Sequence, residues 1–220
     1  MTALAFRAPL QRNSGAANWL IPLGLLALAF IPIAGGAFRL TTLVGQAEIT
    51  SVNARFFASP IPVVLHIVSV TLFSILGAFQ FSPGLRRRWP VWHRAAGRIF
   101  VGVGLVAALS GLWMAMFYAI VPADNALLHA FRLSFGAAMA ASIFVGFVAI
   151  RRGNVAVHQA WMRRAYAIGL GAGTQAVTQI PLVMILGKLD PMALALAMGG
   201  AWILNLAVAE WLILRKRSRP

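Results

Sequence analysis

Apolar runs separated by short polar segments recur along the whole chain and predict six membrane-spanning helices. Each run is long enough to cross the roughly 30 Å hydrocarbon layer of a bilayer as a helix. The connections are mostly short, and Asp190 followed by Pro191 is a typical helix start, with a cap and a proline in the first turn. The predicted spans are residues 17–38, 60–82, 95–121, 127–150, 160–187 and 191–214.

Composition supports a membrane protein. The 220 residues are 60% hydrophobic and only 10% charged, whereas soluble domains carry about 25% charged residues. No stretch between the runs is long enough for a soluble domain, so we expect a single all-α membrane domain over residues 1–220. The chain has no cysteine, which excludes disulfides, thiolate metal sites and covalently attached c-type haem.

The net charge of +15 raises the possibility of nucleic-acid binding, but its distribution favours another interpretation. The basic residues form short clusters between apolar spans, as expected when charge sets membrane orientation. Fifteen of the 19 basic residues fall in segments that would then be cytoplasmic; the other four are Arg39, Arg55, Arg132 and Lys188. The pattern predicts a multi-pass protein of the cell (inner) membrane that binds no nucleic acid, with cytoplasmic tails over residues 1–16 and 215–220.

Two segments near the N-terminus allow alternatives. The first span follows Arg7 and Arg12 and resembles a signal peptide, but its apolar run is longer than a signal core, so we expect a retained helix. Residues 39–59 form the long outer loop. Leu40, Val44 and other apolar residues recur there at near-helical spacing, which fits either a helix on the membrane surface or a loop over the bundle.

Four histidines are the most informative chemical feature. His66 and His129 fall near the outer face on the second and fourth spans, whereas His93 and His158 fall near the inner face at the starts of the third and fifth. The separations are similar, 27 residues (93 − 66) and 29 residues (158 − 129), and an arginine follows each inner histidine after five residues. This spacing indicates a duplicated helical hairpin.

Such a duplication would make spans two to five an antiparallel four-helix bundle with inward-facing ligands. Paired imidazoles complete the coordination of haem iron. We therefore predict two b-type haems, one held by His66 and His129 and one by His93 and His158, at depths that differ by roughly 20 Å. Small residues on the same helix faces would leave room for the macrocycles, and Arg98, Arg132 and Arg163 would bind their propionates.

These features also have plainer interpretations. Small residues at such spacings allow close helix packing without a cofactor, and basic side chains near a membrane face commonly extend toward water. Thr174, Gln175, Thr178 and Gln179 in the fifth span would line a quinone or substrate pocket or, as we favour, form hydrogen bonds between helices.

Three segments carry a family resemblance: Phe79-Gln-Phe81, Trp92-His-Arg-Ala-Ala-Gly-Arg98 and His158-Gln-Ala-Trp-Met-Arg-Arg-Ala-Tyr166. They resemble a family of bacterial predicted membrane proteins of unknown function, over roughly residues 60–185. Separately, the histidine layout is similar to the two-haem b-type cytochromes that act as transmembrane ascorbate and ferric reductases. That resemblance implies six spans and pairs His66 with His129 and His93 with His158. In this chain the inner histidines lie at the very ends of their helices, unlike in those cytochromes.

The leading hypothesis is a dihaem electron-transfer protein embedded in the lipid bilayer, which would pass electrons from quinol or a redox partner protein to an acceptor on the other face. The alternative is a non-redox membrane protein, such as an accessory subunit, a small-molecule transporter or a lipid-interacting protein. A third possibility is a protein that binds one haem through the outer pair alone.

Overall fold

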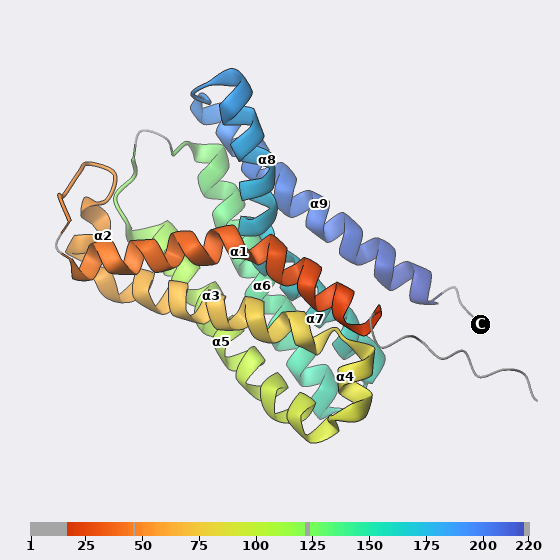
Figure 1. Cartoon of the computed structure of the whole chain (residues 1–220). Helices are drawn as coiled ribbons and strands as arrows, with labels where there is room; N and C mark the ends of the chain where they lie inside the picture. The colour runs from red at the N-terminus through yellow and green to blue at the C-terminus, as the bar shows by residue number, and fades with distance from the viewer. Residues whose placement is uncertain (1–16, 46, 122–123, 218–220) are drawn as a thin grey trace, which may run out of the picture.

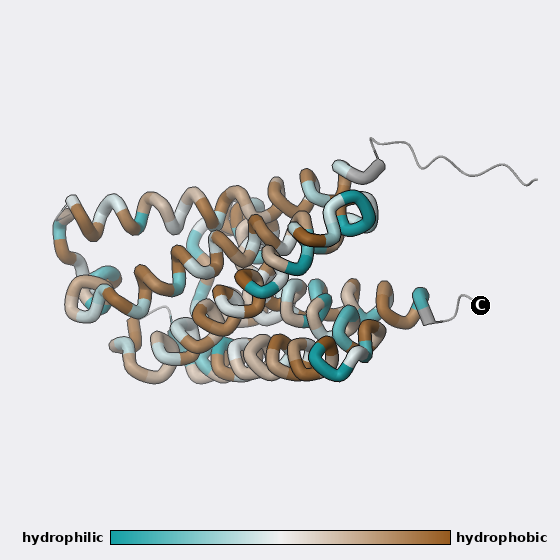
Figure 2. Tube along the Cα trace, turned by 90° about the horizontal axis from the view of Figure 1, so that it is seen from below, coloured by the Kyte–Doolittle hydropathy of each residue, from teal (hydrophilic) through white to brown (hydrophobic). Residues whose placement is uncertain are grey.

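A computed structural model describes residues 17–45, 47–121 and 124–217, and these ranges consist of α-helices and short connections, with no strand. Six helices or helix pairs are long and apolar enough to cross a membrane, which confirms the predicted fold class. Hydrophobic residues dominate the helix shafts (Figure 2). The helices are α1 (Ala17–Val44), α2 (Ala54–Ala58), α3 (Pro60–Gln80), α4 (Pro83–Arg88), α5 (Pro90–Phe117), α6 (Ala126–Arg151), α7 (Val155–Gly169), α8 (Gly171–Leu186) and α9 (Pro191–Arg217).

Local sequence signals explain where most helices begin. Proline occupies the first position of α3, α4, α5 and α9, where its missing N–H costs no hydrogen bond. Asn125 accepts a hydrogen bond from the Leu128 N–H at the start of α6. Asp190 accepts hydrogen bonds from the first N–H groups of α9, as its position before Pro191 predicts.

Two helix boundaries differ from the hydropathy pattern. α1 runs to Val44, so the first part of the predicted outer loop extends this helix, and only α2 forms a separate helix within residues 39–59. α5 begins at Pro90, five residues before the predicted span, and therefore includes His93. Proline geometry, not the start of the apolar run, sets this boundary.

The four middle spans form an antiparallel bundle, as predicted. α3 packs along α5, α5 along α6 and α6 along α7, and contacts between α7 and α3 close the bundle. α1 lies against α3 and α8, and α9 lies against α6, α7 and α8 (Figure 1). We call the end of the bundle at α2 and Tyr118 the α2 end, and the end at α4 and the loop 152–154 the α4 end.

The fifth span is broken at Leu170, between α7 and α8. α7 belongs to the bundle, whereas α8 leaves it and packs on α9 and α1 (Figure 1). Asn205 of α9 bridges the break: its Nδ2 donates to the Ala167 carbonyl over 3.0 Å, and its Oδ1 accepts from the Thr174 hydroxyl over 2.8 Å. The neighbouring helix thus supplies hydrogen bonds on both sides of the interruption, as buried polar groups in a membrane require.

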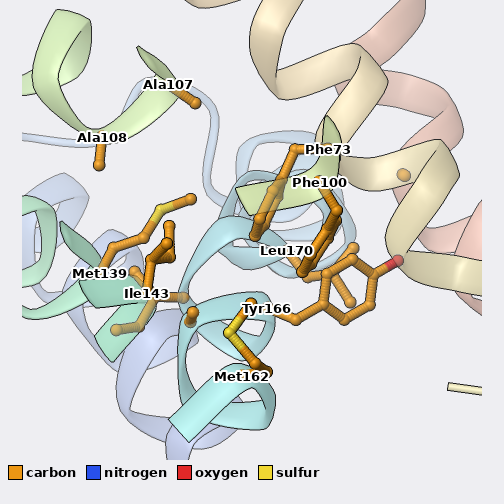
Figure 3. Close-up of a cluster of buried hydrophobic side chains, with 12 residues drawn as sticks. Phe73, Phe100, Ala107, Ala108, Met139, Ile143, Met162, Tyr166 and Leu170 are labelled. Carbon is orange, nitrogen blue, oxygen red and sulfur yellow. The ribbon is translucent and has the colours of Figure 1, made fainter. Parts of the chain in front are cut away.

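Aromatic side chains fill the middle of the bundle (Figure 3). The rings of Phe73 and Phe100 are stacked with centroids 4.3 Å apart, and the Tyr166 ring lies beside both. The Tyr166 hydroxyl donates to the Ser74 carbonyl over 2.8 Å, which satisfies a buried polar group. We call Phe73, Phe100 and Tyr166 the aromatic layer; it ties α3, α5 and α7 together between the two ends.

Candidate functional site

The histidines lie at two levels on the four bundle helices. His66 on α3 and His129 on α6 lie toward the α2 end, and His93 on α5 and His158 on α7 lie in the first turn or so of their helices at the α4 end. Because each helix packs mainly on its sequence neighbours, α3 is diagonal to α6 and α5 is diagonal to α7. Each predicted pair therefore comes from two helices that face each other across the bundle.

His66 is fixed to the neighbouring helix α5. Its Nδ1 lies 2.9 Å from the Ala107 carbonyl oxygen and 3.3 Å from the Ser110 hydroxyl. Gly111 lies directly beside the ring, since a Cβ there would be 3.2 Å from His66 Cε1. A larger side chain at this position would press on the imidazole.

His158 is held in the same manner at the other end. Its Nδ1 lies 2.9 Å from the Gly146 carbonyl oxygen on α6. In both histidines a backbone carbonyl can accept the hydrogen only if Nδ1 is protonated, and in the neutral ring Nε2 is then unprotonated. An unprotonated Nε2 is the form of imidazole that binds metal ions, and a carbonyl behind the ring is its usual support.

His93 has a different environment. Its Nδ1 is buried and has no hydrogen-bond partner among the described residues, while its backbone carbonyl accepts from Gln80 Nε2 over 3.3 Å. His93 lies near enough to His158 for charges on the two rings to interact. The predicted inner pair thus lies in one region at the α4 end, and one buried ring nitrogen there is available to a bound group.

His129 is half-buried and forms no hydrogen bond with His66 in the described part of the chain. Gly136 and Ile143 follow it at intervals of seven residues, so the three share one helix face. That face is directed at α5, because Gly136 lies against Leu112 and Ile143 lies against Gly104. His129 is thus placed on an inward face near the level of His66.

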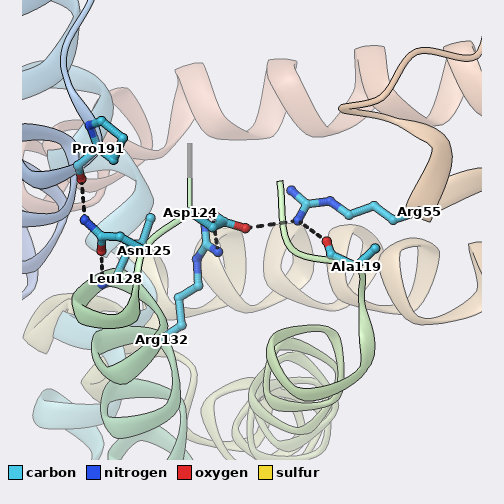
Figure 4. Close-up of polar contacts among 7 residues, drawn as sticks. All are labelled: Arg55, Ala119, Asp124, Asn125, Leu128, Arg132 and Pro191. Carbon is cyan, nitrogen blue, oxygen red and sulfur yellow. Dashed lines mark hydrogen bonds and ion pairs between the residues drawn. The ribbon is translucent and has the colours of Figure 1, made fainter. Parts of the chain in front are cut away.

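The predicted outer arginine, Arg132, already has a protein partner (Figure 4). Its guanidinium lies 2.8 Å from one carboxylate oxygen of Asp124, and Arg55 lies 3.2 Å from the other. Arg55 also donates to the Ala119 carbonyl. We call Arg55, Asp124 and Arg132 the outer ion-pair network; it joins the segment that contains α2 to the start of α6.

Tyr118 adds to the same end of the bundle. Its hydroxyl donates to the Ser59 carbonyl over 2.7 Å, and its ring packs edge-on against Phe56. Burial raises the pKa of the Tyr118 hydroxyl above its usual range. These contacts, together with the outer ion-pair network, fix Tyr118, Asp124 and α2 to the bundle.

Basic side chains surround the histidines at the α4 end. Arg86 of α4 lies close enough to His93 and to Arg163 for their charges to interact, and Arg94 lies near His93 as well. No ion pair with Arg86, Arg94 or Arg163 occurs within the described ranges, and Arg98 is exposed. This end therefore presents concentrated positive charge beside two imidazoles, which favours an anionic group.

Arg164, next along α7, is already paired. It binds both carboxylate oxygens of Glu210 in a bidentate contact, and its guanidinium lies over the Trp161 ring. It is therefore a structural link between α7 and α9, unlike its neighbour Arg163.

The small residues that we expected to leave room for a cofactor divide into two groups. At the middle level the protein's own side chains fill the space: a Cβ on Gly104 or Gly169 would lie 2.6 Å from Phe73, and one on Gly77 would lie 2.1 Å from Tyr166. Beside His93, by contrast, Gly97 has only the Gln80 amide oxygen within 4 Å, at 3.8 Å. The prediction of open space is thus wrong at the middle level, where glycines accommodate rings.

A cavity of about 180 Å³ lies between α1, α3 and the α7–α8 break. His66, Thr71 and Ser74 line it from α3, Pro32 and Gly36 from α1, and glycine and leucine residues from the break. His129 is not among its lining residues. Sequence reasoning missed this cavity, although the cluster of glycines at 169, 171 and 173 marked the interruption that borders it.

The polar residues of α8 are occupied in contacts between helices. Besides the bond from Thr174 to Asn205, Gln175 Nε2 donates to the Met198 carbonyl of α9 over 3.2 Å. Thr178 bonds to carbonyls of its own helix. The favoured interpretation of these residues, interhelical hydrogen bonding, is confirmed for Thr174 and Gln175.

Comparison with protein-family models matches residues 63–213 to a family described as "Predicted membrane protein (DUF2306)". The chain belongs to this family. The resemblance drawn from the His-Arg-x-x-Gly-Arg and His-x-x-Trp-Met segments is thereby confirmed, since both segments lie within the match. No curated protein and no solved structure matches the chain.

The DUF2306 match begins at Val63, in the first turn of α3, and ends at Ile213 in α9. It includes the complete bundle, all four histidines and the helix break, whereas α1 lies outside it. The comparisons give no support for a likeness of this DUF2306 protein to two-haem cytochromes, and that likeness stays a hypothesis drawn from the histidine layout.

Proposed function

We propose that this protein is a b-type dihaem electron-transfer protein of the cell membrane. The observation that carries the proposal is the matching environment of two histidines at opposite ends of the bundle. His66 and His158 each have Nδ1 2.9 Å from a backbone carbonyl oxygen of an adjacent bundle helix, α5 for His66 and α6 for His158. In each neutral ring, Nδ1 then carries the hydrogen, and the unprotonated Nε2 can bind a metal ion or accept a hydrogen bond.

The pairing follows from the diagonal arrangement of the helices. His66 would hold one haem with His129, and His93 would hold the other with His158. The second pair has the stronger support, because the charges of the two rings are close enough to interact and His93 has a buried nitrogen without a partner among the described residues. Imidazoles on diagonal helices of a four-helix bundle are suited to grip a planar group from both sides.

The separation of the levels suits transport across a membrane. Gln80 lies 14 residues after His66 on α3 (80 − 66) and contacts the backbone of His93. Fourteen residues of helix rise roughly 21 Å, so the two levels are separated by most of the hydrocarbon thickness. Haem bound at each level would supply a one-electron carrier.

The surroundings fit haem better at the α4 end than at the α2 end. Arg163, Arg86 and Arg94 are placed to bind carboxylates there, and Gly97 leaves open space next to His93. Arg98 is exposed and would reach a propionate only at the rim of the site. At the α2 end Arg132 is shared with Asp124, so a propionate would compete with an existing ion pair.

We propose that the α4 end faces the cytoplasm and that both termini lie on that side. The support is the concentration of arginine in α4, the start of α5 and α7, against the few basic residues at the α2 end. Electrons would then pass between a donor on one face and an acceptor on the other, with quinol or a redox partner protein as the expected donor.

The visible spectrum of the purified protein tests this function. After expression with haem available, we expect a low-spin b-type spectrum that changes on reduction. His66→Ala and His93→Ala should each remove about half of the haem, and Gln179→Ala, on α8 and away from the histidines, should remove none.

The outcomes separate the hypotheses. A wild-type protein that is folded by circular dichroism and gel filtration but has no haem spectrum would refute the proposal and favour a non-redox membrane protein. Loss of haem with His66→Ala but not with His93→Ala would select a single haem held by the outer pair.

A further inference from the structure

We infer that the cavity between α1, α3 and the α7–α8 break binds the ring of a membrane quinone. The cavity exists because backbone regularity is interrupted on two sides. Pro32 has no N–H for the Leu28 carbonyl of α1, and the fifth span breaks at Leu170. Pro32 and Leu170 both line the cavity.

Size favours a single ring. A cavity of about 150 Å³ in another protein is known to hold benzene, and this one measures about 180 Å³. One six-membered ring with small substituents therefore fits, whereas a haem macrocycle is far too large. The cavity is therefore not itself a haem site, although it shares His66 with the proposed outer one.

The polar groups in the cavity favour a quinone over a plain hydrocarbon. Thr71, Ser74 and His66 are the polar residues that line the cavity, all from α3, and its other lining residues are apolar or glycine. The His66 ring itself is turned toward α5. Thr71 and Ser74 are three residues apart on one face of α3, roughly 4.5 Å along the helix axis. Hydrogen-bonding groups at two levels match a ring that carries carbonyl oxygens at opposite edges, and an acyl chain would leave them unsatisfied.

Access and position support the same ligand. The cavity is partly open and borders α1, a helix at the periphery of the bundle whose side chains are largely exposed. A lipophilic molecule can therefore reach it from the bilayer. The bound ring would lie beside His66, the proposed ligand of the outer haem. A redox role for the quinone rests on the proposed function, but quinone binding does not.

Photo-crosslinking tests the inference. The full chain in lipid nanodiscs would be irradiated with an azido derivative of decylubiquinone, and labelled peptides would be mapped. We expect labelling in α1, α3 or residues 169–173 that unmodified decylubiquinone suppresses. Palmitate, which has a chain but no ring, should not suppress it.

Two variants and a control sharpen the experiment. Thr71→Val keeps the shape but removes a hydroxyl, so the half-saturating concentration of decylubiquinone should rise roughly three- to tenfold, as for loss of one hydrogen bond. Ala172→Leu adds bulk at an exposed position on the rim and should abolish labelling. Thr178→Val makes the same chemical change on α8, outside the cavity, and should behave as wild type.

The inference is overturned if wild-type protein is not labelled in these segments, if palmitate competes as well as the quinone, or if Thr71→Val and Ala172→Leu both bind as wild type does. The readout needs no haem. Labelling without a haem spectrum would therefore refute the proposed electron transfer and support the quinone site, and the reverse result would do the opposite.

Discussion

The outer ion-pair network gives the most direct test of the structure at the α2 end. Asp124→Asn keeps the size of the side chain and removes the charge that both Arg55 and Arg132 bind, at 3.2 and 2.8 Å. Two guanidinium groups would then lie near each other without a carboxylate. The connection between the segment that contains α2 and the start of α6 should weaken.

Burial sets the expected magnitude. The side chain of Asp124 is 10% exposed, and those of Arg55 and Arg132 are 17% and 31% exposed. Breaking a fully buried ion pair costs about 3–5 kcal/mol, whereas fully exposed pairs contribute about 0–1 kcal/mol. The network lies between these limits, so Asp124→Asn should lower the free energy of unfolding by about 2 kcal/mol.

Reversible unfolding in mixed detergent micelles, followed by tryptophan fluorescence, would measure this loss. Glu48→Gln is the matched control, because Glu48 is an exposed acid near the same end whose carboxylate forms no ion pair among the described residues. The double variant Asp124→Asn with Arg132→Met should cost less than the sum of the single changes. If Asp124→Asn is no more destabilising than Glu48→Gln, the network contributes nothing and the reasoning is refuted.

Two further predictions concern the broken fifth span. Gly173→Ala should destabilise the protein by about 1–3 kcal/mol, because a Cβ there would lie 2.3 Å from the backbone oxygen of Leu28. Gly102→Ala is the control: a Cβ there would have nothing within 4 Å, so this variant should be neutral or slightly stabilising in the same unfolding assay. Asn205→Leu should lower the free energy of unfolding by about 1 kcal/mol, in the range of hydrogen bonds within membranes. Amide hydrogen exchange should become faster near Ala167, because its carbonyl loses its donor. Unchanged exchange there would argue against the bridging role.

Much of the fold was predictable because its signals are local. The length of the apolar runs set the number of spans, and Asp190 with Pro191 marked the start of α9. The start of α5 was placed too late because Arg94 and Arg98 interrupt the apolar pattern, while Pro90 determines where the helix begins. Hydropathy reports where lipid begins, and helices extend beyond that depth.

The break between α7 and α8 could not be predicted from the apolar pattern, which continues through it. It depends on Asn205, 35 residues further along the chain (205 − 170), and on the close approach of neighbouring helices to small residues. A Cβ on Gly171 would lie 2.1 Å from the Trp202 ring nitrogen. Small residues look alike in a sequence whether they accept a neighbour's ring, border a cavity or leave space for a ligand.

The candidate site was predictable in position but not in detail. Helical spacing placed the histidines at two depths, since depth follows from counting residues along a span. Which group each side chain meets depends on the partner helix. Arg132 is paired with Asp124, whereas Arg163 forms no ion pair with any residue that the structure describes. The two arginines are therefore not equally available to a cofactor, contrary to the expectation from the sequence.

The aromatic layer has a consequence for the proposed haem sites. Phe73, Phe100 and Tyr166 fill the bundle between the two histidine levels, and Gly104 and Gly169 admit the Phe73 ring so closely that little rearrangement is possible there. Such close packing holds this layer together through contacts among the protein's own side chains, which need no ligand at either level. Removing a ligand at one end should therefore leave the other site intact, so partial loss of haem in a single histidine variant would report on one site and not on collapse of the bundle.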